Sequence, residues 1–224
     1  MELSGKKVTV VGTGISGIGA VGLLNAVGAE VVLYDGNEKL KIEDIEKKLG
    51  TYKAEIVLGE LTKELTDSSD LLVISPGVPI DSPVVKAFEA AGVPVWGEVE
   101  LAYAFDKGKV LAITGTNGKT TTTALVGQIV GAYHKDTFVV GNIGNPYTTE
   151  VLKSNKDSYT VAEISSFQLE TVPEFHPLVS AILNITPDHL NRHYTMDCYV
   201  QTKEKIAMNQ KGAEVCVLNF DDDY

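Results

Sequence analysis

A glycine-rich segment followed by a lysine and two threonines has the residue types and spacing of a phosphate site. Gly115-Thr116-Asn117-Gly118-Lys119-Thr120-Thr121 follows the apolar run Val110–Ile113 and precedes a helical pattern. Glycines let backbone N–H groups surround phosphate oxygens, a helix N-terminus favours negative charge, and lysine adds a mobile cation. We therefore expect nucleoside triphosphate chemistry, with Lys119 on the phosphates and the Thr120 hydroxyl on magnesium.

This loop is a variant of the usual pattern, and an alternative reading stays open. The common spacing G-x-x-x-x-G-K-[ST] has a glycine where Ile113 stands. The alternative is an ordinary strand-to-helix turn that carries a surface lysine.

A second glycine loop lies near the N-terminus. Gly12-Thr13-Gly14-Ile15-Ser16-Gly17 fits G-x-G-x-x-G, follows a predicted strand and opens a predicted helix, and Asp35 ends the next strand. By itself this pattern indicates a dinucleotide site, or glycines that serve only close packing. A dehydrogenase has no need of Lys119, so we expect a different diphosphate ligand here. The turn Ser75–Pro79 ends another strand and is a second candidate to approach that ligand, or a plain proline-glycine turn.

Three polar side chains of the second half follow apolar strands, where open α/β sheets bind their ligands. Glu163 lies in the apolar run Tyr159–Ile164, where a carboxylate is costly unless a cation compensates it, so we expect a magnesium role. His189 follows Ser180–Ile185, and Asn142 follows a further strand. Taken alone, these two residues fit a loop histidine and a turn asparagine equally well.

Short apolar strands alternate with helical patterns throughout the chain, which predicts two doubly wound parallel α/β domains. We assign residues 1–97 to a Rossmann-like domain and 98–224 to a P-loop-type ATPase domain, with a short helix at 98–105 and a turn at 106–108. The longest helix is expected at 121–132. The predicted strands are Val8–Val11, Val31–Tyr34, Glu55–Leu58, Leu71–Ile74, Val93–Trp96, Val110–Ile113, Phe138–Val140, Tyr159–Ile164, Ser180–Ile185 and Glu214–Leu218.

Composition limits the possible partners. The 224 residues carry a formal net charge of -11, which argues against nucleic acid and anionic membrane surfaces. No apolar run is long enough to span a bilayer, and no secretory leader is apparent. Cys198 and Cys216 do not form a C-x-x-C pair, so we expect free thiols in the cytoplasm. The sequence leaves the oligomeric state open.

Four motifs, in order, resemble the Mur ligases of peptidoglycan synthesis, over nearly the whole chain. They are the phosphate loop Gly115–Thr121, the segment Gly141–Gly144, the segment Glu163–Glu170 and the segment Asn184–Leu190. The stretch Ser165–Leu169 most resembles the branch that adds D-glutamate. In this family the first glycine loop holds a UDP-sugar instead of NAD.

The resemblance implies roles for individual residues. ATP would be held by Lys119 and by the other residues of the phosphate loop, namely Gly115, Thr116, Asn117, Gly118, Thr120 and Thr121. Thr120 and Glu163 would bind one Mg2+. His189 and a carbamylated Lys203 would bind a second. The catalytic candidates are therefore Lys119, Lys203 and His189. The substrate-binding candidates are Ile15, Ser16, Asp35, Gly77, Val78, Asn142, Ser165 and Gln168. Gly36 replaces a hydroxyl residue often found beside the aspartate in the family, so one uracil contact differs.

The implied reaction is ATP-dependent amide formation between UDP-N-acetylmuramoyl-L-alanine and D-glutamate through an acyl phosphate. We expect the second domain to be incomplete, the family's third domain to be missing, and the 224-residue chain alone to be inactive. Three alternatives remain: a non-catalytic module that keeps UDP-substrate binding, an NAD-dependent oxidoreductase, and a sibling ligase for another amino acid.

Overall fold

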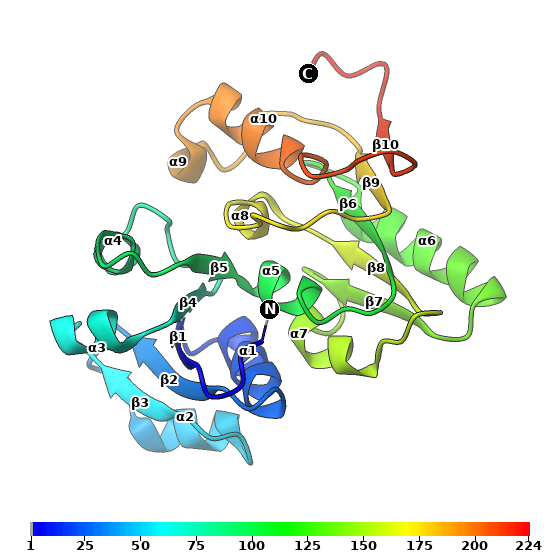
Figure 1. Ribbon diagram of the computed structural model, residues 1–224. Coiled ribbons are helices and arrows are strands. Elements are labelled where there is room, and N and C mark those ends of the chain that lie inside the picture. The colour runs from blue at the N-terminus through cyan, green and yellow to red at the C-terminus, as the bar shows by residue number, and fades with distance from the viewer. Residues whose placement is uncertain (1) are drawn as a thin grey trace. The chain divides into compact units, whose positions relative to one another are not determined.

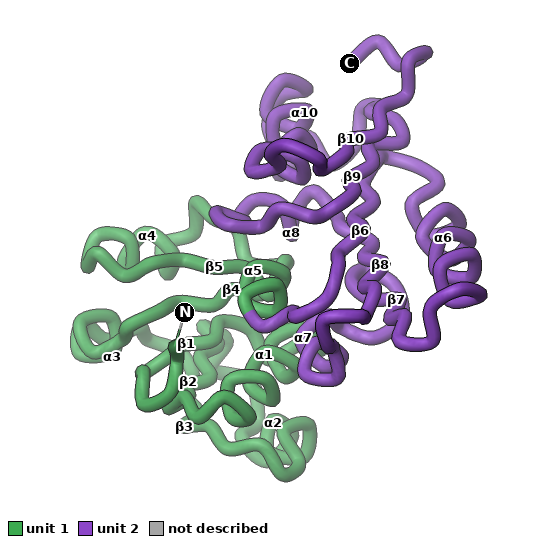
Figure 2. Tube along the Cα trace, turned by 45° about the vertical axis from the view of Figure 1, so that its right-hand side comes forward, with its two compact units in different colours: residues 1–104 green, residues 105–224 purple. Residues whose placement is uncertain are grey.

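The computed structural model describes residues 2–224 and divides the chain into two compact units, with the division between Ala104 and Phe105 (Figure 2). Each unit is an α/β layer structure built on one parallel sheet (Figure 1). The predicted fold class is confirmed.

The first unit has the strand order β3-β2-β1-β4-β5 among the described residues. Its central strands β1 and β4 are buried almost throughout, as expected for parallel strands covered by helices on both faces. The order reverses between β1 and β4, so the loops after these two strands lie side by side at the carboxyl edge. The elements are β1 (Lys7–Val11), α1 (Ile15–Ala26), β2 (Glu30–Asp35), α2 (Ile42–Leu49), β3 (Glu55–Leu58), α3 (Lys63–Ser68), β4 (Leu71–Ile74), α4 (Pro83–Ala90), β5 (Val95–Gly97) and α5 (Glu98–Tyr103).

The second unit has the strand order β10-β9-β6-β8-β7 among the described residues. Strand β6 is central, with β8 and β9 as parallel neighbours, so the segments that follow these three strands reach one edge of the sheet. The elements are β6 (Lys109–Thr114), α6 (Lys119–Tyr133), β7 (Thr137–Gly141), α7 (Tyr147–Glu150), the 3-10 helix η1 (Val151–Lys153), β8 (Tyr159–Glu163), α8 (Ser166–Leu169), β9 (Val179–Ile182), α9 (Leu190–His193), α10 (Met196–Glu204) and β10 (Val215–Leu218).

All ten predicted strands form, although some of their ends differ from the prediction. Strand β9 ends at Ile182 and not at Ile185, because the following residues turn away to bind the loop after β6. Helix α6 begins at Lys119, two residues before the predicted start. The two compact units divide after residue 104, between the end of the first assigned domain at 97 and the predicted turn at 106–108. Helix α5 belongs to the first unit because it packs on α1, β4 and β5.

No helix in residues 2–224 combines the length and apolar character needed to cross a bilayer.

Candidate active site

The loop between β6 and α6 has the backbone geometry of an anion-binding turn. Gly118 precedes α6 in the left-handed conformation, at a φ of +81°, and no side chain caps the helix. The first N–H groups of α6 are therefore available to an anion. The Lys119 ammonium donates to the carbonyl oxygens of Gly115 and Thr116, at 2.9 Å each. Thr120 and Thr121 lie exposed at the start of the helix.

Asn184, the first residue of the motif Asn184–Leu190, to which the sequence assigned no individual role, holds this loop in place. Its Oδ1 accepts from the Asn117 N–H at 2.8 Å, its Nδ2 donates to the Asn117 carbonyl at 3.0 Å, and its own carbonyl accepts from the Thr116 N–H at 2.8 Å. Two sequence signals point to it: it begins that motif, and it is a lone amide in the apolar run Ile182–Ile185. The segment after β9 therefore shapes the phosphate loop.

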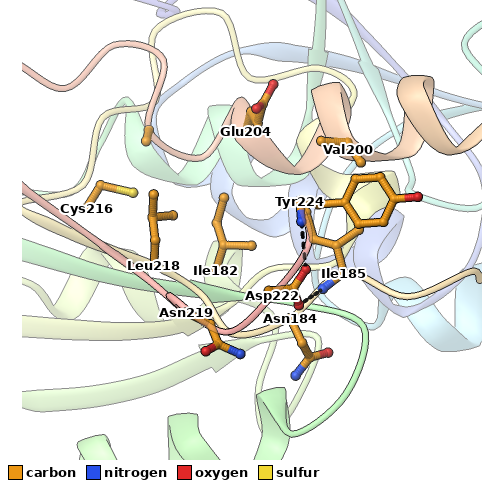
Figure 3. Close-up of a pocket in the computed structure, with 11 residues that line it drawn as sticks. Ile182, Asn184, Ile185, Val200, Glu204, Cys216, Leu218, Asn219, Asp222 and Tyr224 are labelled. Carbon is orange, nitrogen blue, oxygen red and sulfur yellow. Dashed lines mark hydrogen bonds between the residues drawn. The ribbon is translucent and has the colours of Figure 1, made fainter.

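Asn184 also lines a pocket of about 280 Å3 formed by α10, β10 and the segment after β9 (Figure 3). Its walls are largely apolar, with Ile182 and Leu218 among them. Asp222 also lines it, and its carboxylate accepts from the Ile185 N–H at 2.9 Å. The residue that holds the phosphate loop thus also lines this pocket.

Lys203 lies against the same loop. Helix α10 buries Tyr199 and Lys203, which are four residues apart and therefore on one face. The Lys203 ammonium donates to the Gly115 carbonyl at 2.8 Å, and the Tyr199 hydroxyl lies 3.1 Å from Thr116 Oγ1. Burial, followed by the nearby charge of Lys119, lowers the pKa of Lys203 from 10.5 to about 7. A large share of the Lys203 amine is therefore neutral, and nucleophilic, near neutral pH.

Glu163 is the buried carboxylate of the site, with 1% of its surface exposed. Its Oε1 accepts from Asn142 Nδ2 at 2.7 Å, while its buried Oε2 has no hydrogen-bond partner. Gly141 makes this approach possible, because a Cβ there would lie 2.2 Å from the Glu163 carbonyl oxygen. An unpaired buried carboxylate oxygen is costly, so Oε2 fits a divalent cation as its partner. Across residues 2–224 no three His, Cys, Asp or Glu side chains form a metal cluster, so such a cation needs other ligands too.

His189 follows β9 at the same edge of the sheet. Its backbone is left-handed, at a φ of +51°, and its side chain is about half exposed. The imidazole lies against the Phe167 ring, with 4.8 Å between centroids, and its Nε2 is 3.5 Å from Asp188 Oδ2. Its role as a metal ligand stays a prediction.

Ser165 and Gln168, which we expected to bind substrate, form a capping box at the start of α8. The Ser165 N–H donates to Gln168 Oε1 at 2.8 Å, and the Gln168 N–H donates to Ser165 Oγ at 3.3 Å. These contacts place the helix just after Glu163. A direct substrate role for either residue stays a prediction.

His193 is a buried histidine that the motif analysis did not single out. Its Nε2 lies 2.9 Å from Ser166 Oγ, and burial, followed by the charge of Arg192, lowers its pKa from 6.5 to about 4. The unfolded chain therefore binds this proton below about pH 6.5, while the folded protein does so only below about pH 4. Stability is lost as the pH falls through that window. The other charged or titratable groups around it are His189, Lys203, Lys205, Glu170 and Tyr199.

We predict that His193→Gln flattens the dependence of unfolding free energy on pH between 6.5 and 4. The variant removes a change in unfolding free energy of about 3 kcal/mol or less over this window, at about 1.4 kcal/mol per pKa unit. Urea denaturation at several pH values measures it. His176→Gln, at an exposed histidine, is the matched control and keeps the wild-type slope. A slope that persists in His193→Gln would assign the effect to other groups.

The glycine loop of the first unit faces the turn after β4. A Cβ on Gly12 would lie 2.8 Å from Ser75 Oγ, and this buried hydroxyl has no hydrogen-bond partner. The Asp35 carboxylate accepts from the Thr13 hydroxyl at 3.0 Å and from the Asn37 N–H at 3.1 Å, so it holds the loop. Ile15 and Ser16 begin α1, where Ile15 is 80% exposed. Gly77 and Val78 lie in the turn after β4.

Comparison with known proteins decides the family. The family model described as Mur ligase middle domain matches residues 113–224, and the one described as Mur ligase MurD-like, N-terminal domain matches residues 6–97. The chain belongs to the Mur ligase family. It is 70% identical over 224 residues to UDP-N-acetylmuramoylalanine--D-glutamate ligase of Lachnospira eligens and 57% identical over 225 residues to that of Lachnoclostridium phytofermentans. All of this chain and 50% of each relative are covered, so the chain spans half their length.

Two solved ligase structures share the fold. The UDP-N-acetylmuramate:L-alanyl-gamma-D-glutamyl-meso-diaminopimelate ligase of Neisseria meningitides superposes with a TM-score of 0.60 at 16% identity, over 98% of this chain and 73% of that one. A murein peptide ligase of Psychrobacter arcticus gives 0.54 at 17% identity, over 97% of this chain and 50% of that one. At these identities the likeness concerns the fold alone.

Proposed function

We propose that this chain is the UDP-substrate and ATP-binding part of a ligase that joins D-glutamate to UDP-N-acetylmuramoyl-L-alanine. One observation carries the proposal: the Lys119 ammonium donates to the Gly115 and Thr116 carbonyls of a phosphate-type loop. A mobile ammonium in such a loop suits a polyphosphate, and a dehydrogenase has no need of it. The names of the relatives support the same activity.

Lys119 and the first N–H groups of α6 bind the ATP phosphates. To do so, the Lys119 ammonium exchanges its contacts with the Gly115 and Thr116 carbonyls for phosphate oxygens. The loop backbone keeps its shape through Asn184, so the N–H groups stay directed at the anion.

Magnesium ions, when bound, neutralise charge on the phosphate oxygens. Glu163 Oε2 and the Thr120 hydroxyl would hold one ion, and His189 with Lys203 a second. An ammonium cannot ligate a cation, but the neutral amine of Lys203 can add CO2 to become a carbamate. The lowered pKa of Lys203 and its burial support this role.

The reaction then has two steps. The alanyl carboxylate attacks the γ-phosphorus of ATP, which gives an acyl phosphate and ADP. The D-glutamate amine next attacks the acyl carbon, loses a proton, and expels inorganic phosphate through a tetrahedral intermediate. The residues of the site contribute positioning of the reactants, which can supply about 7–11 kcal/mol of the barrier. They also neutralise the charge that develops on oxygen.

The first unit binds the UDP-linked substrate at its glycine loop. The start of α1 carries Ile15 and Ser16 and offers backbone N–H groups to a diphosphate, and the unpartnered Ser75 hydroxyl offers a further hydrogen bond. Gly77 and Val78 bring the turn after β4 to the same ligand. In the second unit, Asn142, Ser165 and Gln168 would border the reacting end of the substrate. ATP and UDP-linked precursors are cytoplasmic metabolites, so we infer a cytoplasmic protein.

We predict that Asp35→Ala weakens binding of UDP-N-acetylmuramoyl-L-alanine by about 1.5–3 kcal/mol, the value of a hydrogen bond to a charged group. The variant also removes the contacts of Asp35 with Thr13 and Asn37, which shape the loop. Titration calorimetry measures the affinity, and Asp67→Ala on α3 is a control on the same unit. An unchanged affinity in Asp35→Ala would remove this carboxylate from the site.

The deciding experiment uses the full-length protein with ATP, UDP-N-acetylmuramoyl-L-alanine and D-glutamate, and follows phosphate release. Turnover that requires all three substrates is the expected result. No phosphate release, with tight NAD binding in calorimetry, would instead favour the oxidoreductase. Binding of the UDP-substrate without turnover would identify a binding module, and turnover with another amino acid would identify a sibling ligase.

A further inference from the structure

A buried ion pair joins the short helices α8 and α9. Arg192 donates from Nε to Glu170 Oε1 at 3.0 Å and from Nη2 to Glu170 Oε2 at 2.5 Å. The two side chains are 12% and 5% exposed. A two-point contact of this kind fixes the plane of the guanidinium as well as its position.

The fixed guanidinium lies over the ring of Phe167, with its central carbon 5.0 Å from the ring centroid. The same ring contacts the imidazole of His189, at 4.8 Å between centroids and 49° between planes. Glu170, Arg192, Phe167 and His189 thus form a continuous stack from a buried carboxylate to a half-exposed imidazole.

His189 precedes a short helix, and its side chain is partly exposed. Its backbone is left-handed, which is unfavourable for a residue with a Cβ, and it precedes a helix of only four residues. Its side chain is 49% exposed, so with water as its only neighbour the imidazole could adopt several rotamers. The Phe167 ring restricts which of them the imidazole adopts.

We propose that Arg192 and Glu170 are positioning residues that orient His189 toward a divalent cation, acting through Phe167. The inference rests on the proposed role of His189 in the ligase. The competing explanation is that the ion pair only ties α8 to α9. A buried pair contributes little net stability against an apolar replacement, but breaking one by removing a partner is costly, so stability data cannot separate the two explanations.

The test measures the dissociation constant of Mn2+ by electron paramagnetic resonance, on full-length protein saturated with ATP. Phe167→Leu removes the ring, and Arg192→Lys keeps the charge but cannot bind Glu170 at two points. Both variants should raise the Mn2+ dissociation constant about 10–100-fold, the range for residues that orient a metal ligand. Phe167→Tyr keeps the ring and should restore wild-type affinity. Glu150→Gln, which breaks the Lys153–Glu150 pair elsewhere in the unit, should leave it unchanged.

His189→Ala separates failure of this inference from failure of the metal role. If His189→Ala weakens Mn2+ binding while Phe167→Leu and Arg192→Lys do not, the positioning role is wrong and the ion pair is structural. If His189→Ala also leaves the dissociation constant unchanged, both the metal role of His189 and this inference are wrong. Should Arg192→Lys fail to fold, the comparison of Phe167→Leu with Phe167→Tyr decides alone.

Discussion

Lys119→Ala should lower kcat of the full-length ligase by roughly 10^2–10^3-fold, about 2.7–4 kcal/mol of transition-state stabilisation. The Lys119 ammonium is the mobile cation of the phosphate loop, held by the Gly115 and Thr116 carbonyls until phosphate replaces them. Its charge opposes the negative charge on the transferred phosphoryl oxygens, a contribution that water cannot supply in a closed site. Phosphate release under saturating substrates measures the effect.

Lys156→Ala is the control for this prediction, since Lys156 is an exposed lysine of the same unit and should keep wild-type kcat. A melting temperature recorded for each variant separates the effect of losing the lysine charge from the effect of a disrupted loop structure. If folded Lys119→Ala keeps kcat within a few-fold of wild type, Lys119 is not the phosphate lysine.

Glu163→Gln should lower kcat by about 10^3-fold, about 4 kcal/mol, while it leaves the metal-free protein at least as stable as wild type. Glutamine keeps the size of the side chain and an oxygen for the Asn142 amide, but it replaces the buried charged Oε2 with a neutral group. A buried carboxylate oxygen without a hydrogen-bond partner destabilises the fold, so replacing Oε2 by a neutral group should not lower the melting temperature. Activity and stability are thus expected to move in different directions.

Phosphate release and a thermal melt without divalent ions test both parts. A lower melting temperature with near-normal kcat would assign Glu163 a structural role and contradict the metal site. Glu150→Gln, at another partly buried carboxylate of the second unit, controls for the substitution itself.

The fold could be predicted from the sequence because its signals are local. Alternating apolar runs such as Leu71–Ile74 predict buried strands, and the segment between two parallel strands is long enough only for a crossover helix. The two glycine loops were also readable, since Gly12 and Gly118 occupy backbone conformations that other residues avoid. Lys119 and Glu163 stood out because lysine in such a loop and glutamate in such a strand are each unusual.

The contacts around these residues were decided by tertiary structure. Asn184 binds Asn117 across 67 positions, and Lys203 binds Gly115 across 88. No local pattern encodes such a partner, because it depends on which strands become neighbours and in what register. The low pKa of Lys203 has the same origin: a lysine on a helix is charged by default, and only burial against the phosphate loop beside Lys119 favours its neutral form. The sequence by itself therefore determined the fold class, the phosphate loop and the candidate phosphate- and metal-binding residues. The packing of α8, α9 and α10 against the carboxyl edge of the sheet decided how those side chains are held, since burial and hydrogen-bond geometry exist only once distant segments meet.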